Sequence, residues 1–278
     1  MTRRAFVLGH PIKHSRSPLI HGHWLKTYGI AGSYDAIDVA PEAMEAFFER
    51  IRGGEFAGGN VTVPLKEIAF RLCDTHDLDT VHIGATNTLV AVPTADGIIV
   101  HGDNTDHYGF LANLDQYEPR WHKDVENAIV LGAGGAARAI VSALAHRGIP
   151  RVHILNRTAE KALALADELK GPLVGAGLDQ FHMIAGQADL VVNTTTLGMH
   201  GTVFDDIDLG ELPQRALVTD LVYVPLITPL LAAARERGLR VVDGLGMLLH
   251  QAVPGFEAWF GKRPEVTAEL RALVEATL

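Results

Sequence analysis

A glycine-rich turn between an apolar run and an alanine-rich segment is the feature of this sequence that most limits its fold. The run Ala128–Leu131 leads directly into Gly132-Ala133-Gly134-Gly135-Ala136-Ala137. This stretch matches the G-x-G-x-x-G/A pattern of a strand that turns tightly into a helix. The first glycine permits the turn, the second lets backbone approach a pyrophosphate, and the small last residue permits close helix–strand contact. Phosphates would meet free N–H groups at the positive end of the helix dipole, so the turn predicts a dinucleotide-binding unit.

The residues after the next predicted strand indicate which dinucleotide is bound. NAD-binding chains usually place an acidic residue about 20 residues beyond the glycines, against the ribose 2′-hydroxyl. Here that place holds Asn156, Arg157 and Thr158. The guanidinium of Arg157 can bind a 2′-phosphate through two N–H groups, and Asn156 and Thr158 can hydrogen-bond the same phosphate. The sequence therefore favours NADP. The structural alternative is that Thr158 caps the following helix and Arg157 is a solvated surface charge.

Short apolar runs alternate with amphipathic stretches along the chain, which is typical of α/β architecture. From the glycine turn onward the alternation predicts a parallel, doubly wound sheet, and the last 30 or so residues return to helices. Ser17 is expected as the N-cap of the first helix, with Pro18 at its first helical position. The predicted strands are Ala5–Leu8, Asn60–Val63, a hairpin of Thr88–Val92 and Ile98–His101, then Val152–Leu155, Leu190–Val192, Leu217–Asp220 and Leu239–Val242. Further helices are expected to begin at Pro41, Pro64, Asn104, Ala159 and Thr228.

Length and composition limit the classes of function. A chain of 278 residues suggests two domains at about 150 residues each. With 24 Lys and Arg against 33 Asp and Glu, the formal charge of −9 argues against nucleic-acid or membrane-surface binding. Cys73 is the only cysteine, the fourteen histidines form no recognisable ligand motif, and no apolar run approaches the ~20 residues that span a bilayer. We therefore expect a cytoplasmic protein without a metal. No stripe in the sequence indicates an interface, so a monomer and a homodimer both stay open.

Nine short blocks in both halves of the sequence resemble the shikimate dehydrogenase family. They occur in the family's order and span nearly the whole chain, which makes the match specific. One departure is Asn193-Thr194-Thr195-Thr196, where the family often has Asn-Ala-Thr-Ser. The matching blocks are Lys13–Pro18, Asn60–Lys66, Gly84–Thr88, Gly102–Asp106, Gly132–Ala136, Asn156–Lys161, Asn193–Met199, Asp220–Pro225 and Asp243–Gln251.

The resemblance implies a fold and a reaction. A discontinuous α/β substrate-binding domain would comprise residues 1–103 with 244–278, and a Rossmann-type NADP-binding domain would comprise residues 104–243. The C-terminal helices would return to the substrate-binding domain. The implied reaction is the reversible NADPH-dependent reduction of 3-dehydroshikimate to shikimate, in the pathway to chorismate and the aromatic amino acids.

The resemblance also implies roles for individual residues. Lys66 and Asp103 would form the catalytic pair, and Leu221 and Gly244 would lie beside the nicotinamide. The implied substrate-binding residues are Ser15, Ser17, Thr62, Lys66, Asn87, Asp103, Tyr223 and Gln251. The implied cofactor-binding residues are Gly132, Ala133, Gly134, Gly135, Ala136, Asn156, Arg157, Thr158, Lys161, Thr194, Leu221 and Gly244.

The residue types suit this chemistry. Ketone reduction leaves charge growing on oxygen, which a protonated Lys66 stabilises and protonates. Asp103 would orient that lysine. Without the family context, Lys66 reads as a surface lysine and Asp103 as a turn former.

Two alternatives remain open. The first is a paralogue that also accepts quinate or NAD. Ser17 argues against quinate, since quinate-accepting relatives in the family often have threonine there, and Arg157 argues against NAD. The second, of a different class, is a non-catalytic NADP or metabolite sensor on the same fold.

Overall fold

The computed structural model describes residues 2–205 and 207–278, and the chain divides into two compact units. The first unit combines the residues up to Thr105 with Gln251–Ala276. The second unit combines Asp106–His250 with the last two residues. The chain therefore leaves the first unit where helix α5 (Asp106–Tyr117) begins and returns to it within helix α10 (Leu245–Phe260).

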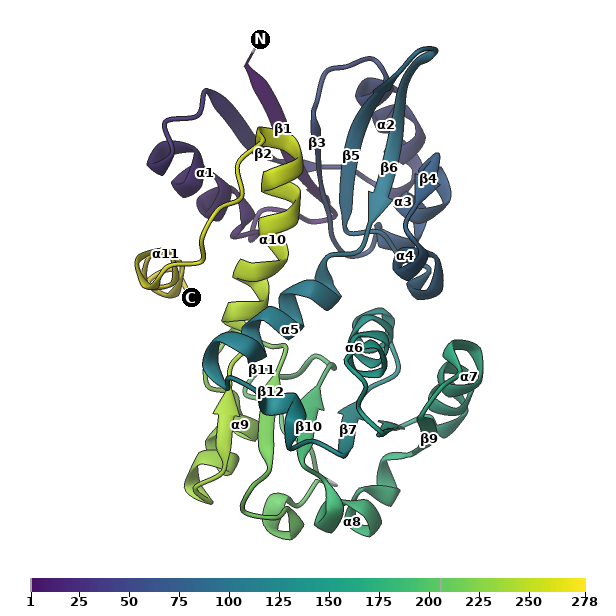
Figure 1. Ribbon diagram of the computed structural model, residues 1–278, viewed down its shortest axis with the longest axis vertical. Coiled ribbons are helices and arrows are strands. Elements are labelled where there is room, and N and C mark those ends of the chain that lie inside the picture. Colours follow the sequence, from purple (N-terminus) through teal and green to yellow (C-terminus); the bar gives the residue numbers. More distant parts are fainter. Residues whose placement is uncertain (1, 206) are drawn as a thin grey trace. The chain divides into compact units, whose positions relative to one another are not determined.

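The first unit contains a six-stranded mixed sheet with the order β2-β1-β3-β5-β6-β4 (Figure 1). β1, β2 and β3 run parallel, whereas β5 is antiparallel to both β3 and β6. Its strands are β1 (Arg3–Gly9), β2 (Gly32–Asp38), β3 (Gly58–Val61), β4 (Thr75–His76), β5 (Thr88–Thr94) and β6 (Gly97–Asp103). Its helices are α1 (Ser17–Thr27), α2 (Met44–Arg52), α3 (Lys66–Leu72), α4 (Leu78–Ile83), the second half of α10, and α11 (Ala268–Glu275).

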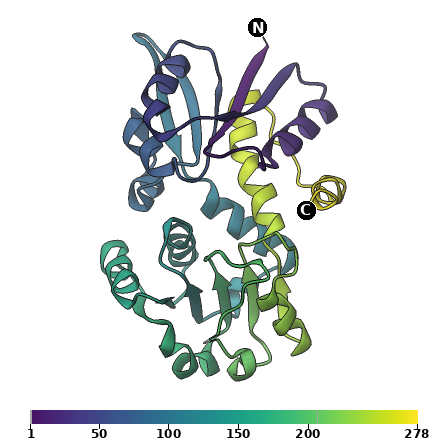
Figure 2. The same cartoon turned by 180° about the vertical axis from the view of Figure 1, so that it is seen from behind.

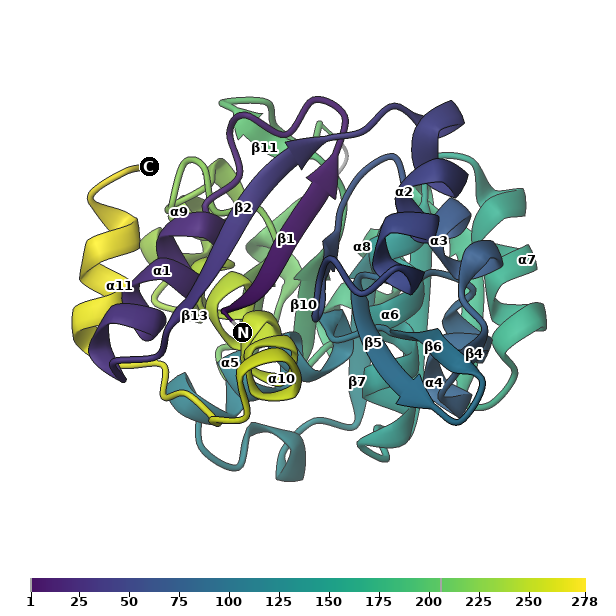
Figure 3. The same ribbon diagram turned by 90° about the horizontal axis from the view of Figure 1, so that it is seen from above.

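Helices cover both faces of this sheet, with α1 and α10 on one side of β1 and α2 and α3 on the other (Figure 3). On the α2 side, the ring of Phe6 meets those of Phe47 and Phe56 edge to face, at centroid distances of 5.0 and 4.9 Å. On the other side, Trp259 of α10 donates its indole N–H to the carbonyl of Leu89 at 2.8 Å. This bond ties the returning C-terminal segment to the middle of the sheet.

The second unit contains an all-parallel sheet with the order β13-β12-β10-β7-β8-β9, seen from behind in Figure 2. The chain enters at the centre, winds out to one edge, then returns to the centre and winds out to the other edge. The point where the direction reverses lies between β7 and β10. The strands are β7 (Asn127–Leu131), β8 (Arg151–Asn156), β9 (Leu173–Gly177), β10 (Leu190–Asn193), β12 (Leu217–Asp220) and β13 (Arg240–Val242), with β11 (Leu197–His200) outside the sheet. The helices after α5 are α6 (Gly135–His146), α7 (Ala159–Leu169), α8 (Phe181–Ile184) and α9 (Pro229–Glu236).

Successive side chains of β7 point to opposite faces of the sheet, and both sets are apolar and buried. Ala128 and Val130 pack into a cluster with α5, α6 and α7, while Ile129 and Leu131 pack into one with α8 and α9. A strand that is apolar on both faces is the expected pattern for a parallel sheet between two helix layers.

These observations confirm the predicted α/β architecture, with a Rossmann-type second unit and C-terminal helices that return to the first. Several predicted helix starts were wrong by one to three residues. α2 begins at Met44 after a short 3-10 turn from Pro41, and α5 begins at Asp106 and not at Asn104. Ser17 is the first helical residue of α1 and not its N-cap, and Arg16 stands at the cap position without a side-chain cap bond. Pro64 does not start a helix, because α3 begins two residues later at Lys66.

Among the described residues, no helix is long and apolar enough to cross a membrane.

Candidate active site

The glycine turn lies between the end of β7 and the start of α6. Gly132 has φ +112°, and a Cβ there would lie 2.7 Å from Oγ1 of Thr194. At Gly134 and Gly135, by contrast, a Cβ would meet no protein atom within 4 Å. Packing therefore explains the first glycine only. The open space at the other two lets a phosphate approach the backbone, at a helix start without an acidic residue in its first turn.

A pocket of about 610 Å³ opens beside this turn, at the carboxyl ends of β7, β8 and β10. This is the place where doubly wound sheets bind ligands. The pocket gathers eight of the residues that the sequence predicts for the cofactor: Gly132, Ala133, Gly134, Asn156, Arg157, Thr158, Lys161 and Thr194.

The far end of the pocket carries the charges that a nucleotide needs. Arg157 and Lys161 are exposed there, with no acidic residue at the end of β8. Asn156 donates its Nδ2 to the carbonyl of Thr158 at 2.9 Å, which folds the short segment before α7. Thr158 occupies the N-cap position of α7, but its side chain makes no cap hydrogen bond. The capping explanation for this threonine therefore does not apply.

The remaining predicted cofactor residues lie near this pocket or at the end of β12. Gly135 and Ala136 are the first two residues of α6. Leu221 follows β12, and a Cβ on Gly244 would lie 2.6 Å from the carbonyl oxygen of Leu221. The structure therefore places Leu221 and Gly244 against each other.

A second set of polar residues gathers at one end of the strands in the first unit's sheet. The carboxyl ends of β1, β3 and β6 meet the amino end of the antiparallel β5 at this end of the sheet. The backbone carbonyls of Lys66 and Asp103 accept hydrogen bonds from two consecutive backbone amides. Thr86 donates its N–H to the carbonyl of Lys66, and Asn87 donates its N–H to that of Asp103, each at 3.0 Å. The Oδ1 of Asp103 also accepts from the hydroxyl of Thr80 at 3.5 Å.

The loop after β1 brings further predicted residues to this end of the sheet. A Cβ on Gly9 would lie 2.7 Å from Cγ2 of Thr62, so the start of this loop lies against the end of β3. At the end of the loop, the N–H of Ser17, the first residue of α1, donates to Oγ of Ser15 at 3.3 Å. Ser17 is buried beside the phenol of Tyr34.

A buried amide network, which the sequence did not reveal, supports Asn87. Oδ1 of Asn87 accepts the N–H of Thr105 at 2.8 Å and the hydroxyl of Thr88 at 2.9 Å. Asn60 donates its Nδ2 to Oγ1 of Thr88 at 3.1 Å, and its Oδ1 accepts the Tyr34 hydroxyl at 2.6 Å. No local pattern in the sequence marks these residues, because their pairing depends on strand register.

The last two predicted substrate residues come from later in the chain. Gln251 lies on α10 where the chain returns to the first unit, and its carbonyl accepts the hydroxyl of Thr105 at 2.8 Å. Tyr223 follows β12 and is half-buried in the second unit. Seven of the eight predicted substrate residues therefore belong to the first unit.

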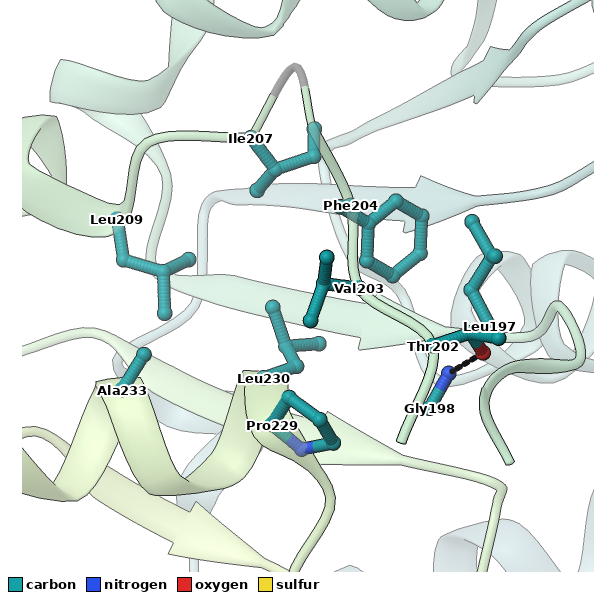
Figure 4. A pocket seen from close by; sticks show the side chains of 10 residues that line it. All are labelled: Leu197, Gly198, Thr202, Val203, Phe204, Ile207, Leu209, Pro229, Leu230 and Ala233. Atoms are coloured by element: carbon teal, nitrogen blue, oxygen red, sulfur yellow. Dashed lines mark hydrogen bonds between the residues drawn. The ribbon is translucent and has the colours of Figure 1, made fainter. Parts of the chain in front are cut away.

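A smaller apolar pocket of about 150 Å³ lies between α9 and the segment that follows β11 (Figure 4). Figure 4 shows Val203, Leu209 and Leu230 turned toward one another. Val203 and Phe204 line both this pocket and the larger one. Sequence reasoning missed these two residues as pocket residues, since their segment carries no motif. In the part of the chain that the structure describes, no group of three or more metal-ligating residues is found.

Family models match the chain over most of its length. Residues 7–89 match the shikimate dehydrogenase substrate binding domain, residues 119–229 match shikimate/quinate 5-dehydrogenase, and residues 244–274 match the shikimate 5′-dehydrogenase C-terminal domain. The chain belongs to the shikimate dehydrogenase family. The match to the substrate binding domain falls within the first unit, and the match to the C-terminal domain begins seven residues before the chain returns to that unit at Gln251.

Individual relatives agree with this assignment. Shikimate dehydrogenase (NADP(+)) of Mesorhizobium japonicum is 54% identical over 277 residues, which is 100% of this chain and 97% of that protein. The shikimate 5-dehydrogenase of Thermus thermophilus, solved with NADP(H) and shikimate, has a TM-score of 0.88 and 36% identity, with 100% of both chains covered. A quinate dehydrogenase of Corynebacterium glutamicum, solved with NAD, has a TM-score of 0.89 and 28% identity, and the match covers 100% of this chain and 99% of that one.

Proposed function

We propose that this chain catalyses the reversible NADPH-dependent reduction of 3-dehydroshikimate to shikimate, a step of the shikimate pathway. The observation that carries the proposal is a full-length identity of 54% to an enzyme of that name. The polar end of the first unit's sheet and the glycine-lined pocket of the second unit supply the two kinds of site that such an enzyme needs.

NADP fits the second unit. The bare backbone at Gly134 and Gly135 leaves the space that a pyrophosphate requires. Arg157 and Lys161 supply positive charge where a 2′-phosphate would lie, and an NAD-specific carboxylate is missing from the end of β8. When bound, NADPH supplies the hydride that reduces the ketone carbon.

The first unit supplies the proton and the orientation of the substrate. Lys66, as the ammonium, gives a proton to the oxygen that becomes the shikimate hydroxyl, and in the oxidative direction its neutral amine takes that proton back. Asp103, as the carboxylate, orients Lys66 and accepts a hydrogen bond from the neighbouring ring hydroxyl. Both backbones are fixed through adjacent amides of one segment, which supports their action as a pair.

The remaining predicted residues bind the rest of the ring. Ser15, Ser17 and Tyr223 hold the carboxylate. Thr62, Asn87 and Gln251 hold ring hydroxyls, as neutral hydrogen-bonding groups suited to a polyhydroxylated substrate. We extend the proposal to the units themselves, with the first as the substrate domain and the second as the NADP domain. A cytoplasmic location, the absence of nucleic-acid partners and the choice between monomer and homodimer stay predictions from the sequence.

One alternative has a specific observation behind it. A quinate dehydrogenase solved with NAD matches this chain with a TM-score of 0.89, so the fold alone does not separate the two substrates. Ser17 and Arg157 favour shikimate and NADP.

An assay of the purified chain decides among these functions. Shikimate and quinate are each paired with NADP and NAD, and the formation of reduced cofactor is followed. Rapid turnover with shikimate and NADP alone supports the proposal. Comparable turnover with quinate or NAD supports the broader paralogue. Folded chain that binds NADP yet is silent in all four reactions would support the sensor.

A further inference from the structure

Two buried hydroxyl groups lie between Asn87 and Gln251, two residues that are far apart in the sequence. The hydroxyls belong to Thr88, at the start of β5, and Thr105, the last residue before the chain enters the second unit. Both side chains are at most 2% exposed. Their Oγ1 atoms lie 3.1 Å apart.

Each hydroxyl has one proton, which fixes the direction of these hydrogen bonds. The hydroxyl of Thr105 lies 2.8 Å from the carbonyl oxygen of Gln251 and 3.2 Å from Oδ1 of Asn87. Its proton therefore goes to Gln251. Thr88 receives the Nδ2 of Asn60 at 3.1 Å, so its own proton is available for Oδ1 of Asn87 at 2.9 Å.

This arrangement determines which end of the Asn87 amide faces inward. Oδ1 receives both the Thr88 hydroxyl and the N–H of Thr105. A flipped amide would turn its NH₂ group toward the backbone N–H of Thr105, whose direction is fixed, and would leave that buried donor without an acceptor, which is costly. The NH₂ group is therefore the end that faces away from the two threonines.

We propose that Thr88 and Thr105 are positioning residues for the substrate. Thr88 holds Asn87 so that it presents a hydrogen-bond donor to an oxygen of the substrate ring, and Thr105 holds the backbone of Gln251 beside it. The proposal rests on the proposed function, because it assumes that Asn87 and Gln251 contact shikimate. It adds two residues that act through others and explains how segments 146 residues apart are set against each other.

The geometry also explains why the sequence places Thr105 at this position. Thr105 is the last residue of the first unit's N-terminal segment, and Gln251 is the first residue of the same unit's C-terminal segment. One side chain thus ties together the two points at which the chain crosses between units. Its N–H reaches Asn87 while its hydroxyl reaches Gln251.

The test compares Thr88→Val and Thr105→Val with wild type, with KM measured separately for shikimate and for NADP. Valine keeps the shape and removes the hydroxyl. We expect each variant to raise the KM for shikimate about tenfold, the effect of roughly one lost buried hydrogen bond, and to leave the KM for NADP within about twofold. Serine at either position restores the hydroxyl and should return the KM for shikimate to within about threefold of wild type.

Double variants separate positioning from general destabilisation. If Thr88 acts through Asn87, Thr88→Val should add less than about twofold in an Asn87→Ala background. In a Gln251→Ala background, Thr105→Val should likewise add less than about twofold to the KM for shikimate. The backbone that Thr105 holds then carries no amide side chain that could contact the substrate. Thr94→Val is the matched control. It removes a threonine-to-carbonyl bond of 2.9 Å to Gly97 in the exposed β5–β6 turn, and both KM values should stay unchanged.

The outcomes are distinct. If wild type does not turn over shikimate, the proposed function fails and this inference fails with it. If wild type is active but the double variants show additive losses, or serine does not rescue, the inference alone is overturned. Should a valine variant not fold, as judged by circular dichroism, alanine at that position replaces it and must show the same rise in the KM for shikimate and the same non-additivity.

Discussion

Oγ1 of Thr194 lies against the position at which a side chain on Gly132 would begin. A Cβ on Gly132 would lie 2.7 Å from that oxygen, which is too close for two unbonded atoms. Thr194 has little freedom to yield, because its hydroxyl donates to the carbonyl of Leu131 at 2.7 Å. The ends of β7 and β10, the two strands at the reversal point of the second sheet, are thereby held together beside the pocket that the glycine turn lines.

Replacing Gly132 with alanine should therefore destabilise the fold. The substitution adds a steric conflict with Thr194 and places a side chain at φ +112°. We expect a loss of about 1–3 kcal/mol in the free energy of unfolding, measured by denaturant titration of the chain without cofactor. A stability equal to wild type would contradict the structural role given to this glycine.

Gly134→Ala should show the opposite pattern. Its φ of −95° suits alanine, and a Cβ would meet no protein atom within 4 Å. The free energy of unfolding should stay within about 0.5 kcal/mol of wild type. The Kd for NADP should rise about tenfold or more, because the methyl group occupies space that a phosphate needs. Fluorescence titration measures the affinity, and unchanged binding would show that phosphate does not approach this residue.

Arg157→Ala should change the choice of cofactor. Loss of the guanidinium removes the partner of the 2′-phosphate, so KM for NADP should rise about tenfold or more while KM for NAD changes little. Arg151→Ala is the matched control, since it removes an exposed arginine from the other end of the same strand, β8. Equal losses with both cofactors would argue against a contact to the 2′-phosphate.

Lys66→Ala should abolish turnover without abolishing binding. Removal of a positioned general acid lowers kcat by about 10²–10⁴-fold. Shikimate binding, measured by calorimetry, should remain detectable, because several neutral residues also hold the ring. Turnover close to wild type would remove Lys66 from its proposed role.

His21 should make the stability of the chain depend on pH. It is fully buried, its ring stacks on that of Tyr34 at 3.9 Å, and burial lowers its pKa from 6.5 to about 3, partly offset by Asn60. Because the unfolded chain binds this proton more readily than the folded chain, its contribution is fully present above pH 6.5. The contribution is lost as the pH falls toward 3, at up to about 1.4 kcal/mol per pH unit.

His21→Phe tests this dependence, because it keeps an aromatic ring but cannot bind a proton. Denaturant titrations from about pH 7 to about pH 4 should show a shallower loss of stability in the variant. The difference between variant and wild type isolates His21 from carboxyls with lowered pKa values, such as Glu55 and Asp74. Identical pH profiles would show that His21 does not titrate as its burial requires.

The sequence by itself determined the α/β architecture, the second sheet's glycine turn and the group of residues around the pocket beside that turn. These are local properties. Strand length, alternation and the turn between Leu131 and Gly135 depend on neighbouring residues. Parallel strands then bring their carboxyl ends to one edge by rule, which is why the sequence alone sufficed to place Asn156 and Arg157 near the glycines.

Tertiary structure decided the rest. Ser17 was mispredicted as an N-cap because α1 begins at Ser17 itself, with Arg16 at the cap position, and the serine is buried beside Tyr34. Thr88 and Thr105 lie in matching blocks of the sequence, but their roles could not be predicted, since these depend on strand register and on a segment that returns 146 residues later. Hydrogen bonds between distant residues depend on how the whole chain packs, and no local pattern in a sequence records them.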